Sequence, residues 1–259
     1  MEQTIQVGNR LVGEGQSCFI VAEAGVNHNG DVALARKLID VAVEAGADAV
    51  KFQKRSIEEI FIQSYLENPY FSVNGLGATY GEHRRRLELT EDEFAYLIEY
   101  AREKGIIFYA SAWDARSADF LDSLQVPAFK ITSADVTNLP LIEHIAKKRK
   151  PIFMSTGMST MDEVDEAVAT IMRYHDQLIL QHCVSTYPCE SKDVNLQVMN
   201  TLRTRFGVPV GYSGHERGIA IPAAAAALGA VVVEKHFTLD RTMKGPDHAA
   251  SLEAQGLQR

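Results

Sequence analysis

The sequence lacks several features that mark whole classes of protein. Its 259 residues include only three cysteines, an odd and sparse count that excludes a disulfide scaffold and favours a reducing compartment. No apolar run approaches the ~18 residues that a membrane-spanning helix needs. The first residues, Met1-Glu2-Gln3-Thr4, have neither the basic nor the apolar region of a signal peptide. We therefore predict a cytoplasmic protein without a membrane partner.

Positive charge is also in short supply. Lys and Arg number 26 against 34 Asp and Glu, which gives a net charge of -8. An acidic chain repels phosphate polymers over most of its surface, so we expect no nucleic-acid partner. A small anionic substrate remains open if a few lysines are focused in a cleft. Hydrophobic residues make up 46% of the chain, which is typical of a globular protein and excludes a disordered one.

The sequence is rich in short apolar runs that alternate with helix-length amphipathic segments. The runs are almost continuously apolar, as is typical of parallel strands covered on both faces. Strands are predicted at 18–24, 49–53, 106–112, 128–133, 151–155, 178–184, 209–213 and 230–237. Helices are predicted at 32–45, 91–104, 116–124, 139–148, 161–173, 194–206 and 218–228. This alternation predicts an α/β fold, a (β/α)8 TIM barrel that takes up residues 1–259 as a single domain.

Three stretches depart from the regular alternation. Residues 1–16 are predicted to form an N-terminal hairpin around Gly8-Asn9-Arg10. The eighth helix is expected to be incomplete, since the chain stops at Arg259, about one to two turns into it. Segment 55–89 lacks a periodic pattern, and a long loop after a strand favours a lid over a site. Its arginine run, 84–86, is interpreted as a solvated face, with a phosphate clamp as the alternative.

Polar residues interrupt or follow the predicted strands at their C-terminal ends, where a barrel of this kind holds its active site. Several form i, i+2 pairs, such as Lys51 with Gln53 and Ser213 with His215, so each pair shares one face of its strand. Such pairs are costly to bury alone, and their recurrence favours a site over a structural polar layer. The candidates are Glu23, Lys51, Gln53, Ser111, Asp114, Lys130, Ser133, Asp135, Ser155, His182, Ser185, Tyr187, Ser213, His215, Glu234, His236 and Asp247.

Two histidines are candidates for a metal site. His215 and His236 end neighbouring strands, so their imidazoles can converge on a divalent ion, with water, a carboxylate or a substrate oxygen in the other positions. Glu234 and Asp247 lie nearby in the sequence and favour this interpretation over packing. The other histidines that we assign are interpreted as structural, at His28 and His182, or as surface residues, at His83, His144 and His175.

Two lysines interrupt apolar strands. A buried lysine must be paired or lose its proton, and Lys51 and Lys130 allow two interpretations. One is a Schiff base, as in barrel aldolases. The other is a pair of cations that holds an anion, which the donors at 155–157, Ser185 and Ser213 favour. The residues alone thus predict a metal-assisted barrel enzyme that acts on a small anionic, phosphorylated substrate.

Longer strings of residues resemble the sialic acid synthase family. They run in order along nearly the whole chain and are specific when taken together. The strings are 23–30 (EAGVNHNG), 50–53 (VKFQ), 79–84 (TYGEHR), 129–135 (FKITSAD), 138–141 (NLPL), 155–158 (STGM), 182–188 (HCVSTYP), 211–215 (GYSGH), 234–240 (EKHFTLD) and 244–252 (KGPDHAASL).

The resemblance implies the chemistry of that family, a transferase reaction that condenses phosphoenolpyruvate with an N-acylated mannosamine-type sugar, or its 6-phosphate, to give a nine-carbon 2-keto acid and phosphate. It implies a divalent metal on His215 and His236, namely Mn2+, with Mg2+ or Co2+ as alternatives. The implied phosphoenolpyruvate contacts are Lys51, Lys130, Ser133, Ser155, Ser185 and Ser213, with Ser111 contributing from the third strand. The implied sugar-side residues are Glu23, Gln53, Asn74, Asp135, Tyr187 and Asp247. Glu234 would orient a ligand or water beside the metal, and Glu23 or Asp135 could manage a proton.

The chain departs from the family pattern at two places. Gly214 stands where many bacterial members have Asp, and 111–114 (SAWD) replaces the commoner Thr-Pro-Phe-Asp. Members usually continue into an antifreeze-like domain that reaches a partner subunit's site with an arginine, and we expect no counterpart within these 259 residues. Open alternatives are a synthase for legionaminic, pseudaminic, spore-coat or octulosonate-type products, a metal-dependent hydrolase, and a non-catalytic paralogue that binds sugar or phosphoenolpyruvate. A homodimer is also left open.

Overall fold

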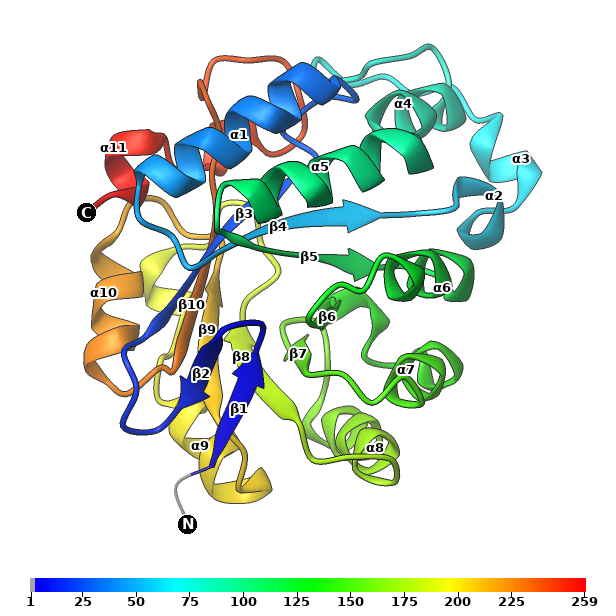
Figure 1. Ribbon diagram of the computed structural model, residues 1–259. Coiled ribbons are helices and arrows are strands. Elements are labelled where there is room, and N and C mark those ends of the chain that lie inside the picture. The colour runs from blue at the N-terminus through cyan, green and yellow to red at the C-terminus, as the bar shows by residue number, and fades with distance from the viewer. Residues whose placement is uncertain (1–2) are drawn as a thin grey trace.

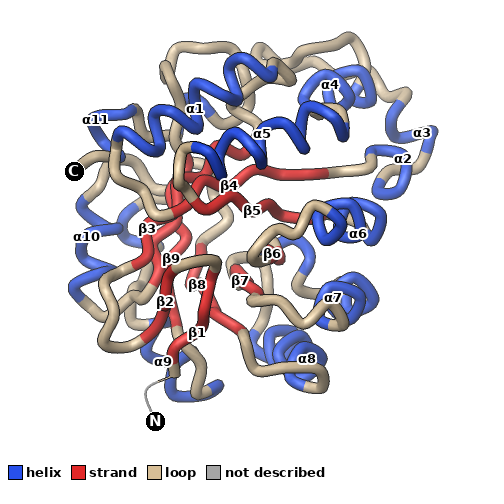
Figure 2. The backbone as a smooth tube through the Cα atoms, viewed as in Figure 1, coloured by secondary structure: helices blue, strands red, loops and turns tan. Residues whose placement is uncertain are grey.

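The computed structural model describes residues 3–259 and shows a closed barrel of eight parallel strands inside a ring of helices (Figures 1 and 2). The strands follow one another around the barrel in chain order, and the last one closes it by pairing with the first. They are β3 Phe19–Gly25, β4 Ala49–Lys54, β5 Ile107–Ala112, β6 Phe129–Ile131, β7 Ile152–Ser155, β8 Leu178–Cys183, β9 Val210–Gly214 and β10 Val232–His236. The predicted (β/α)8 TIM barrel is confirmed.

Seven helices cover the outside of the barrel, close to the ranges predicted for them. They are α1 Val32–Glu44, α5 Glu91–Glu103, α6 Ala115–Ser123, α7 Leu139–Ala146, α8 Met161–Met172, α9 Val198–Phe206 and α10 Ala220–Ala227. Capping boxes at Thr90 and Thr160 start α5 and α8, because each threonine and the glutamate three residues on satisfy each other's backbone N–H groups. The prediction for 194–206 was too long at its start, where the short 3-10 helix η2 Ser191–Asp193 and a turn precede α9.

The chain after β10 contains only short helices. The 3-10 helix η3 His248–Ala250 is followed by α11 Ala254–Leu257, which packs near the first helix, α1 (Figure 1). Four residues make little more than one turn, so the eighth helical position is partly filled, as expected. Within residues 3–259, no helix combines the length and the hydropathy that crossing a membrane requires.

The N-terminal hairpin closes one end of the barrel. It consists of β1 Thr4–Val7 and β2 Arg10–Gly13, paired antiparallel. Ile5, Val7 and Val12 are buried against the inward-facing side chains at the N-terminal ends of the barrel strands. These contacts form an apolar cluster of their own, separate from the larger core between the strands and the outer helices. The barrel interior is therefore filled by apolar side chains at its base.

Segment 55–89 is more regular than the sequence predicted. It contains three short helices, α2 Ile57–Ile60, α3 Gln63–Leu66 and α4 Tyr80–Leu87, which lie beyond the end of β4 (Figure 1). None of them was predicted, because their apolar side chains pack on one another in short turns that leave no 3.6-residue period to detect. No residue of this segment lines the cavity at the barrel mouth, so it does not cover a site as a lid here.

Two side-chain predictions within segment 55–89 can be compared with the structure. His83 was predicted at the surface and is buried, because its ring stacks on Tyr70 with centroids 4.6 Å apart and its Nδ1 accepts the Leu76 N–H at 3.1 Å. In the arginine run, Arg84 donates to the Tyr80 hydroxyl at 2.7 Å. Arg85 pairs with Glu58 at 3.0 Å. These two arginines hold the segment together and do not form a phosphate clamp.

Candidate active site

A cavity of about 260 Å³ opens at the C-terminal ends of the barrel strands. Every one of the eight strands contributes to it, either within the strand or in the residues that follow directly. The predicted site residues that line it are Glu23, Lys51, Gln53, Ser111, Lys130, Ser133, Ser155, Ser185, Tyr187, Ser213, His215, Glu234 and His236. Their convergence follows from the fold, since parallel strands in one barrel present their carboxyl ends at the same mouth.

The strand register explains which of these side chains become neighbours. Glu23 is paired with Lys51 on the next strand, and His236 is paired with Glu23 across the closing seam of the barrel. Glu234 stands beside Ser213 in the same way. Because side chains alternate between the two faces of a strand, the i, i+2 pairs seen in the sequence all point into the barrel.

Four buried charges form the floor of the cavity. Lys51 lies 2.5 Å from Glu23 and 3.5 Å from Glu234, and Lys130 lies 3.0 Å from the other oxygen of Glu234. All four residues are no more than 5% exposed. The two ammonium groups balance the two carboxylates, so burial of the cluster carries no net charge, although each ion still loses its hydration.

The two lysines are not equivalent. Burial alone would lower the pKa of Lys51, but the neighbouring carboxylates Glu23 and Glu234 outweigh it and raise that pKa above its usual value. Burial lowers the pKa of Lys130, since only Glu234 pairs with it and Lys51 repels it. Burial would likewise raise the pKa of Glu234, yet the charges of Lys130 and Lys51 lower it to about 2. Glu234 is thus the anion that holds both cations in place.

Gln181 belongs to this floor and was missed by the sequence analysis. Its Oε1 accepts a hydrogen bond from Lys130, and its Nε2 donates to Glu234 at 3.3 Å. It is fully buried in β8, on the inward face that also carries Cys183, which lines the cavity. A signal was available, because Gln181 and Cys183 are two residues apart at the end of a predicted strand and so share its inward face. Trp113, Thr132 and Met158, which also line the cavity, were not singled out either.

Hydroxyl groups line the wall above the lysines. The Ser111 and Ser155 hydroxyls are buried and have no hydrogen-bond partner among residues 3–259. Ser133 accepts the Gly157 N–H at 2.9 Å. A side chain at Gly157 would place its Cβ 2.7 Å from the Ser185 hydroxyl, so only glycine lets this backbone approach the cavity wall. Buried hydroxyls without partners indicate donors that a ligand would satisfy.

The two histidines face each other at the rim. Their ring centroids are 5.6 Å apart, and the Tyr187 ring lies 3.9 Å from that of His215. His215 Nδ1 lies 2.9 Å from the Val184 carbonyl, so it donates there and leaves Nε2 with a free lone pair. Burial and the neighbouring His236 lower the pKa of His215 to about 3, which keeps the imidazole neutral. His236 Nδ1 is buried and has no hydrogen-bond partner within the described residues 3–259.

A divalent ion fits these imidazoles only if other groups complete its coordination. Neutral imidazoles with free nitrogens are suitable ligands. In the part of the chain that the structure describes, no three His, Cys, Asp or Glu side chains form a cluster that could hold a metal ion. Glu234, the nearest carboxylate in the strand, is already engaged with Lys51 and Lys130. Water or substrate oxygens would therefore fill the remaining positions.

Three predicted site residues do not line the cavity. Asp135 lies in the 3-10 helix η1 Ser133–Asp135, where it accepts from the Thr132 hydroxyl at 2.7 Å. Asn74 lies in segment 55–89, in the turn after Ser72. Asp247 precedes η3, and its carbonyl accepts from the Ser251 hydroxyl at 2.7 Å. The structure thus gathers most of the predicted site at one cavity and leaves these three outside its wall.

Two further candidates, Asp114 and His182, also do not line the cavity and have structural roles. Asp114 caps α6, since its carboxylate accepts the Ser117 N–H at 2.7 Å. His182 points away from the cavity and its Nε2 hydrogen-bonds to the Val194 carbonyl, as a structural histidine should. His28 is buried, and its Nδ1 accepts the Gly30 N–H at 3.0 Å.

Comparison with known proteins connects this geometry to a family. Residues 38–259 match the sequence model of the NeuB family. The chain is 46% identical to human N-acetylneuraminate-9-phosphate synthase over 245 residues, which is 94% of this chain and 68% of that one. It is 43% identical to N,N'-diacetyllegionaminic acid synthase of Legionella pneumophila, over 95% of this chain and 71% of the relative.

A solved structure agrees with both. The crystal structure of an N-acetylneuraminic acid synthetase from Leptospira borgpetersenii, in complex with citrate, superposes with a TM-score of 0.90 at 36% identity, covering 100% of this chain and 86% of that one. The chain belongs to the NeuB family. The two relatives are named as synthases of different products, so membership supports a sialic-acid-type synthase and leaves the exact substrate open.

Proposed function

We propose that the protein condenses phosphoenolpyruvate with an N-acylmannosamine-type sugar, or with its 6-phosphate, to give a sialic-acid-like nonulosonate and phosphate. The observation that carries the proposal is the composition of one cavity. It has a charge-balanced floor with two lysines, buried hydroxyls without partners, and two imidazoles at its rim. Membership of a family of carbon–carbon bond-forming synthases supports it.

The lysines supply the anion site in this proposal. Each ammonium group has three N–H donors, and each makes two of the contacts described above. A donor on Lys51 and another on Lys130 are therefore left for the carboxylate and phosphate of phosphoenolpyruvate. The floor has no net positive charge, so an anion would need further donors beside the lysines. The Ser111 and Ser155 hydroxyls can supply them. A Schiff base is disfavoured for Lys51, whose carboxylate neighbours keep it protonated.

The acceptor aldehyde lies at the rim in this arrangement. His215 and His236 would hold a divalent ion, Mn2+ with Mg2+ or Co2+ as alternatives, which when bound supplies Lewis-acid polarisation of the aldehyde oxygen. The floor orients the enol so that its C3 forms the new bond to the aldehyde carbon, whose oxygen takes up a proton. Water adds to C2, phosphate leaves, and the 2-keto acid remains. Glu23 lines the cavity whereas Asp135 does not, so we assign the contact with acceptor hydroxyls to Glu23.

Phosphate release from phosphoenolpyruvate tests the proposal, measured against a panel of N-acyl mannosamines with and without a 6-phosphate. We expect release only with an acceptor, loss of release in excess chelator, and loss in His215→Ala and His236→Ala. Full activity in chelator would remove the metal from the proposal. Release without any acceptor would favour a hydrolase. A panel extended to the acceptors of legionaminic and pseudaminic synthases separates those alternatives, and binding without turnover would favour a non-catalytic paralogue.

A further inference from the structure

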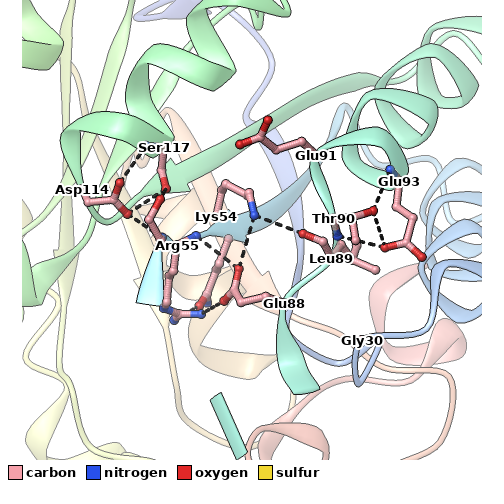
Figure 3. A network of polar contacts seen from close by, with 12 residues as sticks. Gly30, Lys54, Arg55, Glu88, Leu89, Thr90, Glu91, Glu93, Asp114 and Ser117 are labelled. Atoms are coloured by element: carbon pink, nitrogen blue, oxygen red, sulfur yellow. Dashed lines mark hydrogen bonds and ion pairs between the residues drawn. The ribbon is translucent and has the colours of Figure 1, made fainter. Parts of the chain in front are cut away.

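A buried arginine stands directly behind one wall of the cavity. Arg55 follows the last residue of β4 and is only 7% exposed. Its Nη1 lies 3.4 Å from a Glu88 oxygen, and its backbone N–H donates to the other Glu88 oxygen at 3.2 Å (Figure 3). Its Nη2 donates to Gln53 Oε1, and its guanidinium lies 4.1 Å from the centre of the Trp113 ring. Gln53 and Trp113 both line the cavity.

The neighbours of Arg55 fix it in place. Lys54 shares Glu88 at 3.8 Å and donates to the Leu89 carbonyl at 3.0 Å, which ties the end of β4 to the start of α5 (Figure 3). Asp114 accepts the Ser56 N–H at 2.8 Å, which ties the same strand end to α6. Burial lowers the pKa of Arg55 and Glu88 opposes that shift. Since Lys54 and Asp114 already anchor the strand, anchoring alone gives no reason to bury a second cation here.

The contact with Gln53 controls the orientation of an amide in the site. Gln53 Oε1 faces the Arg55 guanidinium, and Gln53 Nε2 donates to Glu23 at 3.0 Å. The flipped amide would set its NH2 group against the donors of Arg55 and its oxygen against the Glu23 carboxylate. Arg55 therefore fixes which atom Gln53 presents to Glu23, whose other oxygen pairs with Lys51. A chain of polar contacts thus runs from behind the wall to the floor.

The contact with Trp113 gives this wall a different chemistry from the floor. Trp113 lines the cavity and Arg55 does not, and the Arg55 guanidinium stacks on the indole and pairs with Glu88, so its positive charge is held by these two neighbours. The Trp113 backbone N–H donates to the Lys54 carbonyl at 3.2 Å, which holds the residue beside Arg55. A flat apolar surface with a fixed amide at its edge fits the C–H face of a neutral sugar or an acylamino group. It offers no cation to a phosphate or a carboxylate.

We propose that Arg55 and Trp113 together form a specificity element for the neutral part of the acceptor. Trp113 is the surface on which the sugar or its acylamino group packs. Arg55 is a positioning residue that holds the Trp113 ring and the Gln53 amide in the conformation the acceptor meets. The proposal rests on the proposed function for the identity of the acceptor, whereas the anion site on Lys51 and Lys130 is independent of it.

Steady-state kinetics separate the two substrates. We expect Arg55→Met and Trp113→Ala to raise the KM for the acceptor about tenfold, while the KM for phosphoenolpyruvate changes less than about twofold. Trp113→Phe keeps a ring and should recover most of the acceptor KM. Trp113→Ala should also shift the preference among acceptors towards longer N-acyl groups, because it opens space in the wall. Arg116→Met is the matched control, since Arg116 is an exposed arginine paired with Glu91 at 3.5 Å.

Tryptophan fluorescence reports on the same wall without turnover. Trp113 is the single tryptophan of the chain, so all tryptophan emission comes from this residue. In the parent, N-acetylmannosamine should change the emission in a saturable way, whereas phosphoenolpyruvate alone should leave it nearly unchanged. Arg55→Met should shift the emission of the free protein, and Arg116→Met should not.

A further variant tests the kinetics. Arg55→Lys keeps the charge but loses the forked contact with Gln53 and Glu88, so we expect an intermediate acceptor KM.

The outcomes distinguish this inference from the proposed function. Turnover in the parent with unchanged acceptor KM in Arg55→Met and Trp113→Ala would overturn the specificity element and leave the synthase intact. Equal losses for both substrates in correctly folded variants would also overturn it, since they indicate general damage to the site. A saturable emission change with N-acetylmannosamine in a parent that shows no turnover would support the wall while refuting the proposed reaction.

Discussion

The two ends of the barrel interior are built from the same strands and have opposite chemistry. At the base, Phe19, Val21 and Phe153 pack with the hairpin in a hydrophobic cluster that contains no charged side chain. At the mouth, the next inward-facing positions carry Glu23 and Lys51, and the interior becomes charged. A shift of two residues along a strand therefore separates a layer that stabilises the fold from a layer that holds a substrate.

The difference lies in how each layer is stabilised. Apolar side chains at the base gain roughly 25 cal/mol for each Å² removed from water, whatever their exact partners. The charges at the mouth lose hydration on burial and depend on one another, so removing one leaves another uncompensated. The base should thus tolerate conservative change with graded losses, whereas the mouth should respond sharply. The following substitutions test that contrast.

Glu234→Gln should have the largest effect on stability. Glu234 pairs with Lys51 at 3.5 Å and Lys130 at 3.0 Å, so the neutral amide leaves two buried ammonium groups facing each other without it. Breaking a buried ion pair typically costs about 3–5 kcal/mol in the free energy of unfolding. Urea unfolding at pH 7 measures this. Glu99→Gln is the control, because Glu99 pairs with Arg102 on the exposed face of α5 and should change stability by less than about 0.5 kcal/mol.

The same residue predicts a pH dependence. Burial opposes ionisation of Glu234, but Lys130 and Lys51 lower its pKa to about 2 from the usual 4.5. Its folded pKa is depressed, so its contribution to stability is complete above pH 4.5 and is lost as the pH falls towards 2. The parent should lose stability in this range more steeply than Glu234→Gln does. Parallel acid titrations of the two proteins would disprove the assignment.

Lys130→Met should have the next largest effect. Glu234 keeps Lys51 as a partner in this variant, so we expect a smaller loss of stability than in Glu234→Gln, together with weaker ligand binding. Losing a hydrogen bond from a charged group costs ~1.5–3 kcal/mol, so calorimetry should show weaker phosphoenolpyruvate binding by roughly ten- to a hundredfold. Lys51→Met should do the same. Lys147→Met, at an exposed pair with Glu143 on α7, serves as the control. A covalent adduct trapped on Lys51 or Lys130 by borohydride would instead establish the Schiff-base alternative.

The contrast between base and mouth also shows what the sequence could predict. The alternation of apolar runs and helical segments was enough for the barrel, because parallel strands covered on both faces leave a continuous apolar signal. The i, i+2 pairs Lys51/Gln53 and Glu234/His236 were enough to place polar side chains inside it. Both inferences depend on local periodicity, which a sequence displays directly.

What the sequence could not predict depends on contacts between distant segments. The sequence gives no distance between Lys130 and Glu234, which are 104 residues apart, so the sharing of Glu234 by two lysines was not foreseen. Gln181 was overlooked because one glutamine hardly changes an apolar run. Asp135 and Asp247 follow strands as site residues do, yet local turns hold them outside the cavity wall. His83 was misplaced because its burial comes from the packing of a segment without helical periodicity.

Ile5→Val tests the base with a smaller change. Ile5 is buried in β1 and packs in the apolar cluster that closes the barrel. Deleting one methylene group from such a site costs about 0.5–1.5 kcal/mol in the free energy of unfolding. Because this layer holds no charge, kcat and both KM values should equal those of the parent at temperatures well below unfolding. A change in KM with little loss of stability would mean that base and mouth are coupled, contrary to the contrast drawn above.

Tyr109→Phe tests the boundary between the two layers and should have the smallest effect. The Tyr109 ring stacks on Phe153 with centroids 5.1 Å apart, as part of the base, while its register partner Lys51 belongs to the mouth. The hydroxyl is buried without a hydrogen-bond partner among residues 3–259, and burial raises its pKa well above the usual 10.0. A buried hydroxyl that makes no hydrogen bond costs desolvation energy and contributes little else. Phenylalanine keeps the stacking on Phe153, so the free energy of unfolding should change by no more than about 0.5 kcal/mol or increase slightly. Thermal unfolding measured beside Ile5→Val decides the point. A loss of more than about 1 kcal/mol would show that the hydroxyl is bound to an ordered water of the charged floor, and the polar layer would then include Tyr109.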